Sequence, residues 1–146
     1  MSEVKPRINF KLGLTGSIGM GKTTVANIFR HNNIPVWSAD SVVHKLYKPN
    51  ASGALAIKKF LPEVVSDEGV CREKLSDLII KKPSLIKKIE EKIFPLVRLN
   101  REKFIEQHKE KTLLLFDIPL LYENKAYLWL DSVLVVTAPK KVQEKR

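Results

Sequence analysis

Eight consecutive residues near the amino terminus match a pattern that binds phosphate groups. The segment Gly16-Ser17-Ile18-Gly19-Met20-Gly21-Lys22-Thr23 satisfies G-x-x-x-x-G-K-[ST] at every required position. Glycines let the backbone curl so that its amide hydrogens point inward, and the following helix adds its positive end. Lys22 can reach the β- and γ-phosphates of a nucleotide, and the Thr23 hydroxyl can ligate Mg²⁺. We therefore expect a nucleotide to be bound by Gly16, Ser17, Ile18, Gly19, Met20, Gly21, Lys22, Thr23 and Thr24.

The residues on either side of this loop predict the elements that must position it. Residues 7–15 alternate enough apolar side chains to predict a strand that runs into the glycine-rich turn. After the turn, Val25, Ile28 and Phe29 recur at helical spacing. The alternative is a glycine turn with a surface lysine. The order strand, loop, helix is the context that the phosphate-binding pattern requires, so this alternative is disfavoured.

Two aspartates follow predicted strands and are candidates for chemistry. Asp117 closes the apolar run 112–117, which is typical of a central parallel strand, and it could help to hold Mg²⁺ or its water shell. Asp40 follows a short predicted strand at 34–37 and begins a helix. Each could instead cap a turn or a helix, and for Asp40 the spacing alone does not decide. Ligands of parallel sheets bind at the carboxyl ends of strands, so we expect Asp40, Asp117 and the loop to converge.

The order of predicted elements indicates an α/β fold with a parallel sheet. Residues 132–137 form a second continuous apolar run, which predicts another strand buried on both faces. Between the second and third strands lies a helical stretch that Pro83 and Pro95 must break or kink. A length of 146 residues predicts one domain. We assign residues 7–39 and 112–146 to its core and residues 40–111 to a helical insertion.

The charge and composition of the chain exclude several classes of protein. A net charge of +10 favours polyanionic partners, and residues 81–111 contribute ten basic and five acidic side chains. Aromatic interleaving is absent there, so a solvated helix surface is favoured over a nucleic-acid patch. The apolar runs are far too short for a membrane helix, and the first eleven residues hold no signal-peptide core. One cysteine and three scattered histidines predict neither a disulfide nor structural zinc. We expect a cytoplasmic protein.

Several segments besides the loop carry a resemblance to a known family. They are Gly13 to Ala26, Ala39-Asp40, Phe94-Pro95-Leu96-Val97, Asp117-Ile118-Pro119-Leu120-Leu121-Tyr122-Glu123 and Gln143 to Arg146. With these segments the chain resembles the dephospho-coenzyme A kinases over nearly its whole length. The resemblance implies a three-layer α/β fold of the P-loop NTPase type, similar to nucleotide kinases, in which the helical insertion 40–111 binds the acceptor.

The resemblance also implies a reaction and roles for residues. The reaction is the ATP-dependent phosphorylation of the ribose 3′-hydroxyl of dephospho-coenzyme A, the last step of coenzyme A synthesis. Asp40 and Lys22 are then catalytic, with Asp40 orienting or deprotonating the hydroxyl, while Thr23 and Asp117 hold Mg²⁺. ATP and dephospho-coenzyme A are the expected partners, without nucleic acid or membrane. The family usually has Asp-Ala-Asp and His-Pro where this chain has Ser38-Ala39-Asp40 and Phe94-Pro95.

Family members continue with an arginine-bearing lid, further helices and a last strand, where this sequence ends at Arg146. The resemblance therefore implies impaired phosphate transfer and a sheet edge through which the chain self-associates. Two alternatives stay open. One is a kinase for another nucleotide or small metabolite that shares the loop, and the other is a non-catalytic protein that binds nucleotides or nucleic acid.

Overall fold

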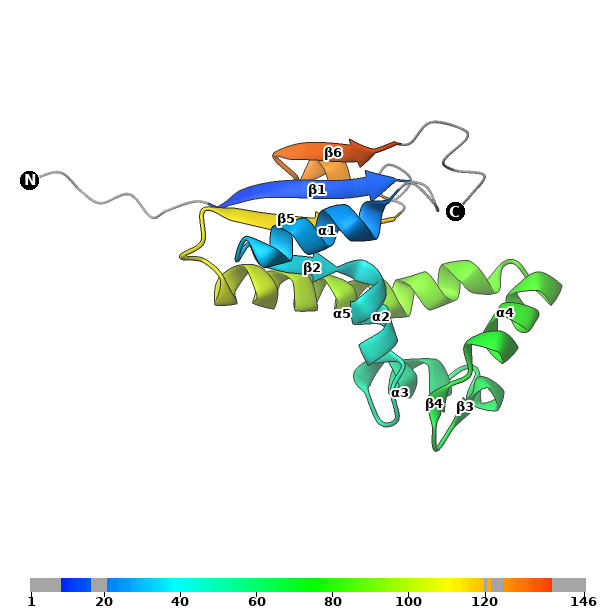
Figure 1. Cartoon of the computed structure of the whole chain (residues 1–146). Helices are drawn as coiled ribbons and strands as arrows, with labels where there is room; N and C mark the ends of the chain where they lie inside the picture. Colours follow the sequence, from blue (N-terminus) through cyan, green and yellow to red (C-terminus); the bar gives the residue numbers. More distant parts are fainter. Residues whose placement is uncertain (1–8, 17–20, 120, 122–124, 138–146) are drawn as a thin grey trace, which may run out of the picture. The chain divides into compact units, whose positions relative to one another are not determined.

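The computed structural model describes residues 9–16, 21–119, 121 and 125–137, which form two compact units (Figure 1). The first unit contains the described residues up to Ala39 and from Lys103 onward, and the second contains Asp40–Glu102. The division of one domain into a core at 7–39 and 112–146 and an insertion at 40–111 stays a prediction.

The first unit is built on a sheet of four parallel strands. They are β1 (Phe10–Gly16), β2 (Val36–Ser38), β5 (Leu113–Asp117) and β6 (Ser132–Val136), in the spatial order β2-β5-β1-β6. Strands β1 and β2 both pair with β5, and β1 also pairs with β6. Parallel strands run in the same direction, so the chain must cross back from the end of one strand to the start of the next. A tight turn is too short for this crossover, and a helix usually provides it. The predicted α/β class with a parallel sheet is confirmed.

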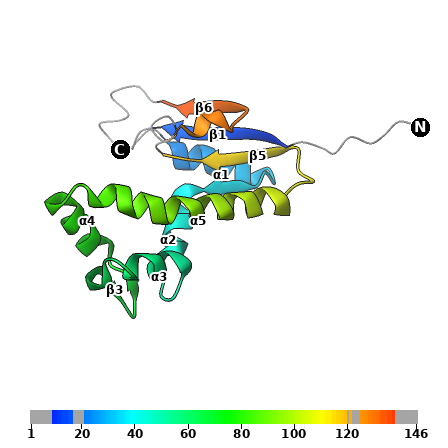
Figure 2. The ribbon, with the colours of Figure 1, turned by 180° about the vertical axis from the view of Figure 1, so that it is seen from behind.

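The two faces of this sheet are covered differently. Helix α1 (Lys22–His31) packs on one face, where Leu14, Ala26 and Leu115 are buried together. On the other face the ring of Phe116 contacts those of Trp37, Phe104 and Trp129, with centroids 6.0, 5.7 and 5.0 Å away. Phe104 comes from the last turns of α5 (Leu85–Gln107), and Trp129 follows the 3-10 helix η2 (Ala126–Leu128). Figures 1 and 2 show these layers from opposite sides.

The two strands that the sequence predicts to be buried on both faces, β5 and β6, differ in their burial. In β5, Leu114, Leu115 and Phe116 have no exposed surface, as expected for a strand with neighbours on both sides. The prediction that residues 132–137 are buried on both faces is wrong. Strand β6 pairs with β1 alone among the described strands, and Leu134 and Val135 are 38% and 48% exposed.

The second unit is mainly helical. Its elements are α2 (Ala39–Leu46), α3 (Ser52–Lys58), a 3-10 helix η1 (Pro62–Val64), the short hairpin β3 (Val65–Ser66) and β4 (Gly69–Val70), α4 (Arg72–Lys81) and the part of α5 up to Glu102. Pro83 separates α4 from α5, whereas Pro95 lies inside α5 without ending it. Its core consists of Ile57, Leu61, Val64, Leu75, Leu85, Ile89 and Ile93. Among the described residues, no helix combines the length and apolarity needed to cross a membrane.

Candidate functional site

The phosphate-binding pattern lies between β1 and α1, as predicted. Gly21 precedes α1 with φ of 84°, in the left-handed region that glycine adopts without strain. Lys22 is the first residue of the helix, and Thr23 and Thr24 in its first turn are exposed. The intervening Ser17, Ile18, Gly19 and Met20 lie outside the described residues. The described part of the segment thus combines a strand end, a left-handed glycine and a helix start, where amide hydrogens are available to phosphate oxygens.

Lys22 and Asp117 form the ion pair at the centre of the site. The Nζ atom of Lys22 donates to Oδ1 of Asp117, and their side chains are only 18% and 16% exposed. Lys22 comes from the start of α1 and Asp117 from the end of β5, so two elements far apart in the sequence supply the pair. Because an unpaired charge at such a position is costly, each group compensates the charge of the other.

Strand register holds Asp117 beside the loop. Asp117 is aligned with Leu14 of β1 on one side and with Ser38 of β2 on the other. Immediately after it, the Ile118 amide donates to the Leu14 carbonyl at 3.0 Å. The Thr15 hydroxyl donates to the Pro119 carbonyl at 3.1 Å. These two bonds continue the pairing between β1 and the chain that follows β5, and they fix the direction in which the Asp117 carboxylate leaves the strand.

Asp40 lies in the first turn of α2 rather than at the N-cap, because the helix begins at Ala39. Its side chain is exposed. A carboxylate in the first helical turn complements the positive end of the helix dipole, so this location gives Asp40 a modest stabilising role whatever else it does. Asp40 is the first residue of the second unit, and it follows β2 by two residues.

The helical unit carries two aromatic side chains that differ in exposure. Phe94 of α5 is 46% exposed, so its ring is accessible to a ligand. Tyr47 is better covered: the Arg72 guanidinium lies 5.2 Å from the centre of its ring. Burial raises the pKa of the Tyr47 phenol above its ordinary value, and the positive charge of Arg72 opposes that rise. The phenol therefore stays protonated through the neutral range.

Two glycines of β1 allow a close packing that the sequence alone does not predict. A Cβ on Gly16 would lie 2.8 Å from the carbonyl oxygen of Val136, its register partner in β6. A Cβ on Gly13 would lie 2.7 Å from a methyl group of Leu121 and 2.5 Å from one of Leu130. Gly16 was predicted to serve the phosphate loop, but the approach of β6 also requires it. No local sequence signal reveals that requirement, because the contacting residues are far along the chain.

A parallel sheet with a strand, glycine loop and helix carrying Lys22, and with Asp117 on the neighbouring strand, defines the P-loop class of nucleotide-binding enzymes. The family model described as dephospho-CoA kinase matches residues 10–146. The chain belongs to the dephospho-CoA kinase family.

Individual relatives agree with this family. A dephospho-CoA kinase of Jannaschia sp. (strain CCS1) is 41% identical over 139 residues, which are 95% of this chain and 72% of the relative. The dephospho-CoA kinase of Brucella melitensis is 44% identical over 137 residues, or 92% of this chain and 68% of the relative. The family kinases are transferases, and the chain therefore belongs with kinases rather than with non-catalytic binding proteins.

Solved structures share the fold. A crystal structure of a Thermus thermophilus protein superposes with a TM-score of 0.78 at 28% identity, covering 94% of this chain and 70% of that one. A dephospho-CoA kinase from Campylobacter jejuni superposes with a TM-score of 0.66 at 16% identity, covering 94% of this chain and 93% of that one. The α/β fold with a parallel sheet is thus shared with solved proteins.

Proposed function

We propose that the chain transfers the γ-phosphate of ATP to the ribose 3′-hydroxyl of dephospho-coenzyme A. In this reaction the 3′-oxygen forms a bond to the γ-phosphorus, the bond from that phosphorus to the β–γ bridging oxygen breaks, and ADP leaves. The acceptor proton passes to a carboxylate. Membership of the dephospho-CoA kinase family supports the substrates. The Lys22–Asp117 pair beside the glycine loop is the observation that carries the donor half.

On the donor side, Lys22 exchanges one anionic partner for another. In the structure its ammonium group bonds to Asp117. A triphosphate in the loop offers β- and γ-oxygens within the reach of a lysine at the start of the helix. Lys22 then neutralises charge on the transferring group, while the amide hydrogens at the start of α1 bind the other phosphate oxygens. The role of residues 16–24 in binding ATP follows from the same argument.

Mg²⁺ fits the residues that flank Lys22. Thr23 supplies an exposed hydroxyl oxygen, and Asp117 supplies carboxylate oxygens that lose Lys22 as a partner when phosphate arrives. Oxygen ligands of this kind, together with phosphate oxygens, are what Mg²⁺ prefers. Thr23 and Asp117 would hold the ion directly or through its water shell. When bound, Mg²⁺ withdraws negative charge from the phosphate groups.

On the acceptor side, we assign to Asp40 the role of accepting the proton of the 3′-hydroxyl. Two peptide units join Asp40 to Ser38, so their Cα atoms are at most about 7 Å apart. Ser38 in turn is aligned with Asp117. The exposure of Asp40 leaves its carboxylate accessible to a ligand. A carboxylate in this role orients the nucleophile and removes its proton as the new bond forms.

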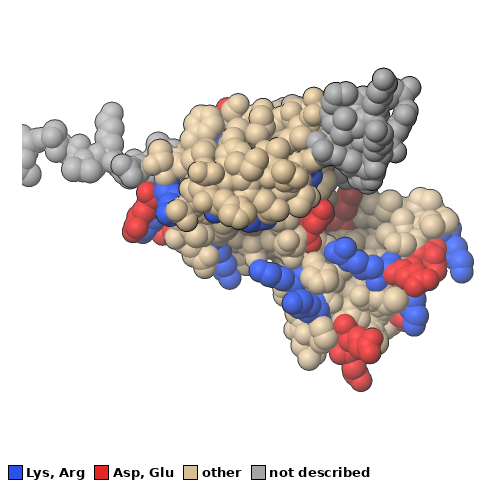
Figure 3. All heavy atoms as spheres, in the orientation of Figure 1, with Lys and Arg blue, Asp and Glu red and all other residues tan. Residues whose placement is uncertain are grey.

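The exposed edge of the sheet supports a second part of the proposal, which is self-association. Tyr127, Leu128, Leu134 and Val135 are between 38% and 73% exposed in η2 and β6. On the face seen in Figure 3, charged side chains gather mainly over the helical unit, and few lie over α1 and β6. An apolar strand edge with few charges invites pairing with another chain. A second copy of this chain is the partner that we propose.

The test of the kinase function uses ATP, Mg²⁺ and dephospho-coenzyme A, with mass spectrometry of the product and phosphorus NMR to locate the new phosphate. We expect a product heavier by one phosphate at the 3′-position. Because the matched relatives are longer, the chain is assayed in parallel with a version extended by the remaining residues of the Brucella melitensis relative. Transfer by the extended chain to nucleosides or shikimate-like acids, with none to dephospho-coenzyme A, would overturn the proposed acceptor.

A further inference from the structure

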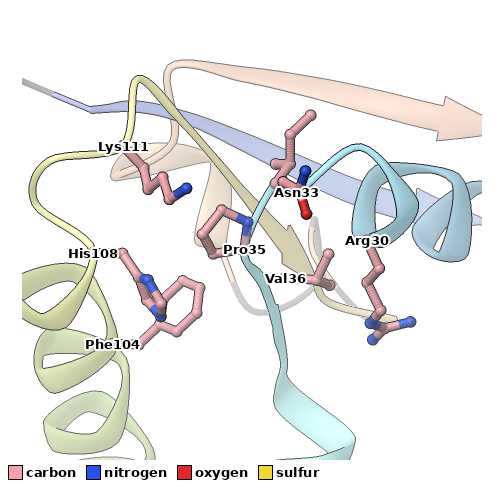
Figure 4. A pocket seen from close by; sticks show the side chains of 8 residues that line it. Arg30, Asn33, Pro35, Val36, Phe104, His108 and Lys111 are labelled. Carbon is pink, nitrogen blue, oxygen red and sulfur yellow. The ribbon is translucent and has the colours of Figure 1, made fainter.

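An open, shallow cavity lies in the first unit near the amino ends of β2 and β5, whereas Lys22 and Asp117 lie at the carboxyl end of β5. It has a volume of about 360 Å³ and is formed by the end of α1, the turn into β2, the end of α5 and the loop before β5 (Figure 4). Pro35 stands at the amino end of β2, and Lys111 precedes β5. Asp117 ends β5. A strand of this length spans roughly 13 Å, so the cavity is separate from the phosphate loop.

The walls of the cavity combine apolar surface with positive charge. Pro35, Val36 and the ring of Phe104 provide the apolar part. The Phe104 ring is held between Phe116, 5.7 Å away, and the imidazole of His108, 4.8 Å away. The basic groups are His108 and Lys111 on one side and Arg30 on the other, as Figure 4 shows. No acidic side chain is among the described residues that line the cavity.

Hydrogen bonds from a buried side chain fix the backbone that carries His108 and Lys111. Asn9 is only 6% exposed, and its side-chain amide donates to the His108 carbonyl at 3.1 Å and also to the Lys111 carbonyl. The Lys111 amide closes the turn by donating to the His108 carbonyl at 3.0 Å. The Leu115 amide donates to the Pro35 carbonyl at 3.0 Å and ties the opposite wall to β5. A ligand would therefore meet basic groups on an ordered loop, which lowers the entropic cost of binding.

We propose that this cavity binds a small aromatic phosphate, with the ring against Phe104 and Pro35 and the phosphate against Lys111 and His108. The cavity is open to solvent, and its volume is sufficient for one small ring with a phosphate group. Phosphate accepts strong, charge-assisted hydrogen bonds from the lysine ammonium group, and an imidazole N–H can donate a further hydrogen bond. A flat ring matches the apolar wall, because aromatic rings pack favourably edge to face or offset. This site is independent of the proposed kinase function, since it shares no side chain with the donor loop.

The test uses phenyl phosphate as the probe and follows the backbone amides of the whole 146-residue chain by NMR. We expect shifts at Asn33, His108 and Lys111 that saturate with the probe. Inorganic phosphate and benzyl alcohol, which carry only the charge or only the ring, should each bind at least about tenfold more weakly. Shifts confined to residues 13–24 would overturn the proposal, because they would mean that the probe occupies only the phosphate loop.

Substitutions separate the cavity from general attraction to a basic protein. Lys111→Gln and His108→Gln should each weaken phenyl phosphate binding by about tenfold. The control is Lys109→Gln, which removes the same charge from an exposed lysine that pairs with Glu106 and does not line the cavity. It should bind the probe like the parent chain. Equal losses in Lys109→Gln and Lys111→Gln would overturn the site. Lys22→Ala should leave the shifts at His108 unchanged, whatever it does to ATP.

Discussion

The two units present their candidate functional groups in opposite ways. In the sheet unit, Lys22 and Asp117 are mostly buried and bonded to each other, and strand register fixes the backbone on both sides of Asp117. In the helical unit, Asp40 and Phe94 are exposed. In the proposed reaction, the fold would position the donor groups before any ligand arrives, whereas the acceptor groups would gain their constraints from the ligand. Substitutions in the two units should therefore change different kinetic constants.

Lys22→Ala should produce the largest effect. It removes the positive charge that faces the transferring phosphate and leaves Asp117 without its partner, so turnover should fall by at least about 10²–10³-fold. ATP binding, measured by calorimetry, should weaken as well, while the folded structure survives. Lys109→Ala is the control, because it removes an exposed lysine far along the chain. Unchanged ATP affinity in Lys22→Ala would refute the phosphate-loop assignment.

Asp40→Asn tests the acceptor side of the comparison. Loss of a proton acceptor typically lowers kcat by roughly 10²–10⁴-fold, and we expect ATP affinity to stay the same. Asp77→Asn, at an exposed position of α4, serves as the matched control. If kcat is unchanged and only the melting temperature falls, Asp40 only stabilises the helix through its dipole and has no role in catalysis.

Asp117→Asn should separate metal binding from nucleotide binding. We expect the Mg²⁺ dependence of turnover to move to about 10–100-fold higher concentrations, because a carboxylate near the ion is lost. Without Mg²⁺, ATP should bind no more weakly than to the parent chain, since Lys22 no longer has to leave an anionic partner. Calorimetry with and without Mg²⁺ measures both quantities. A large loss of ATP affinity in the absence of Mg²⁺ would contradict this exchange of partners.

Phe94→His should sharpen the comparison on the acceptor side. It introduces the residue that the family usually carries, and one added hydrogen bond corresponds to roughly a two- to tenfold lower KM for dephospho-coenzyme A. The KM for ATP should not move, and Phe94 is exposed enough for the change to cost little stability. Initial rates at varied concentrations of each substrate measure the two constants. A change in the KM for ATP alone would mean that Phe94 affects binding of the donor and not of the acceptor.

Val135→Lys should have the smallest effect on chemistry and a visible one on assembly. A lysine on the exposed strand β6 adds charge to an apolar edge, so we expect fewer dimers and larger species in analytical ultracentrifugation. Thr137→Lys adds the same charge just beyond the end of β6 and provides the control. Self-association that is equal in all three chains would exclude the β6 edge as the contact.

Local sequence predicted the parts of the site that depend on local chemistry. The glycine spacing before Lys22 and the apolar run before Asp117 were sufficient to predict a strand, a helix and a second strand in the correct places. The approach of Asp117 to the segment that carries Lys22 was predicted from the carboxyl ends of parallel strands. The direct ion pair was not predicted, because it depends on which strands become neighbours. The burial of β6 was predicted wrongly for the same reason, since an apolar run does not reveal whether a strand has one neighbour or two.

The cavity near the amino ends of β2 and β5 also could not be predicted from local sequence. His108 and Lys111 lie in a stretch whose charge pattern favours a solvated surface. That interpretation holds for most of the stretch. It does not include Pro35 and Val36, which lie far away in the sequence and form the facing wall of the cavity. Residues from distant segments make a cavity only when the sheet brings them together, and periodicity within one segment does not contain that information.

The pairing of β1 with β5 also dictates an order of events during synthesis. Phe10 is aligned with Leu113, which emerges from the ribosome 103 positions later. Until then β1 lacks its central neighbour, and its apolar side chains have no sheet to join. The core of the helical unit draws on residues 57–93, which are all made before β5. Closing so long a loop is slow and exposes aggregation-prone surface while the nascent chain waits. The helical segment can therefore collapse first, and Lys22 meets Asp117 only after the newly made β5 strand has paired with β1 and β2.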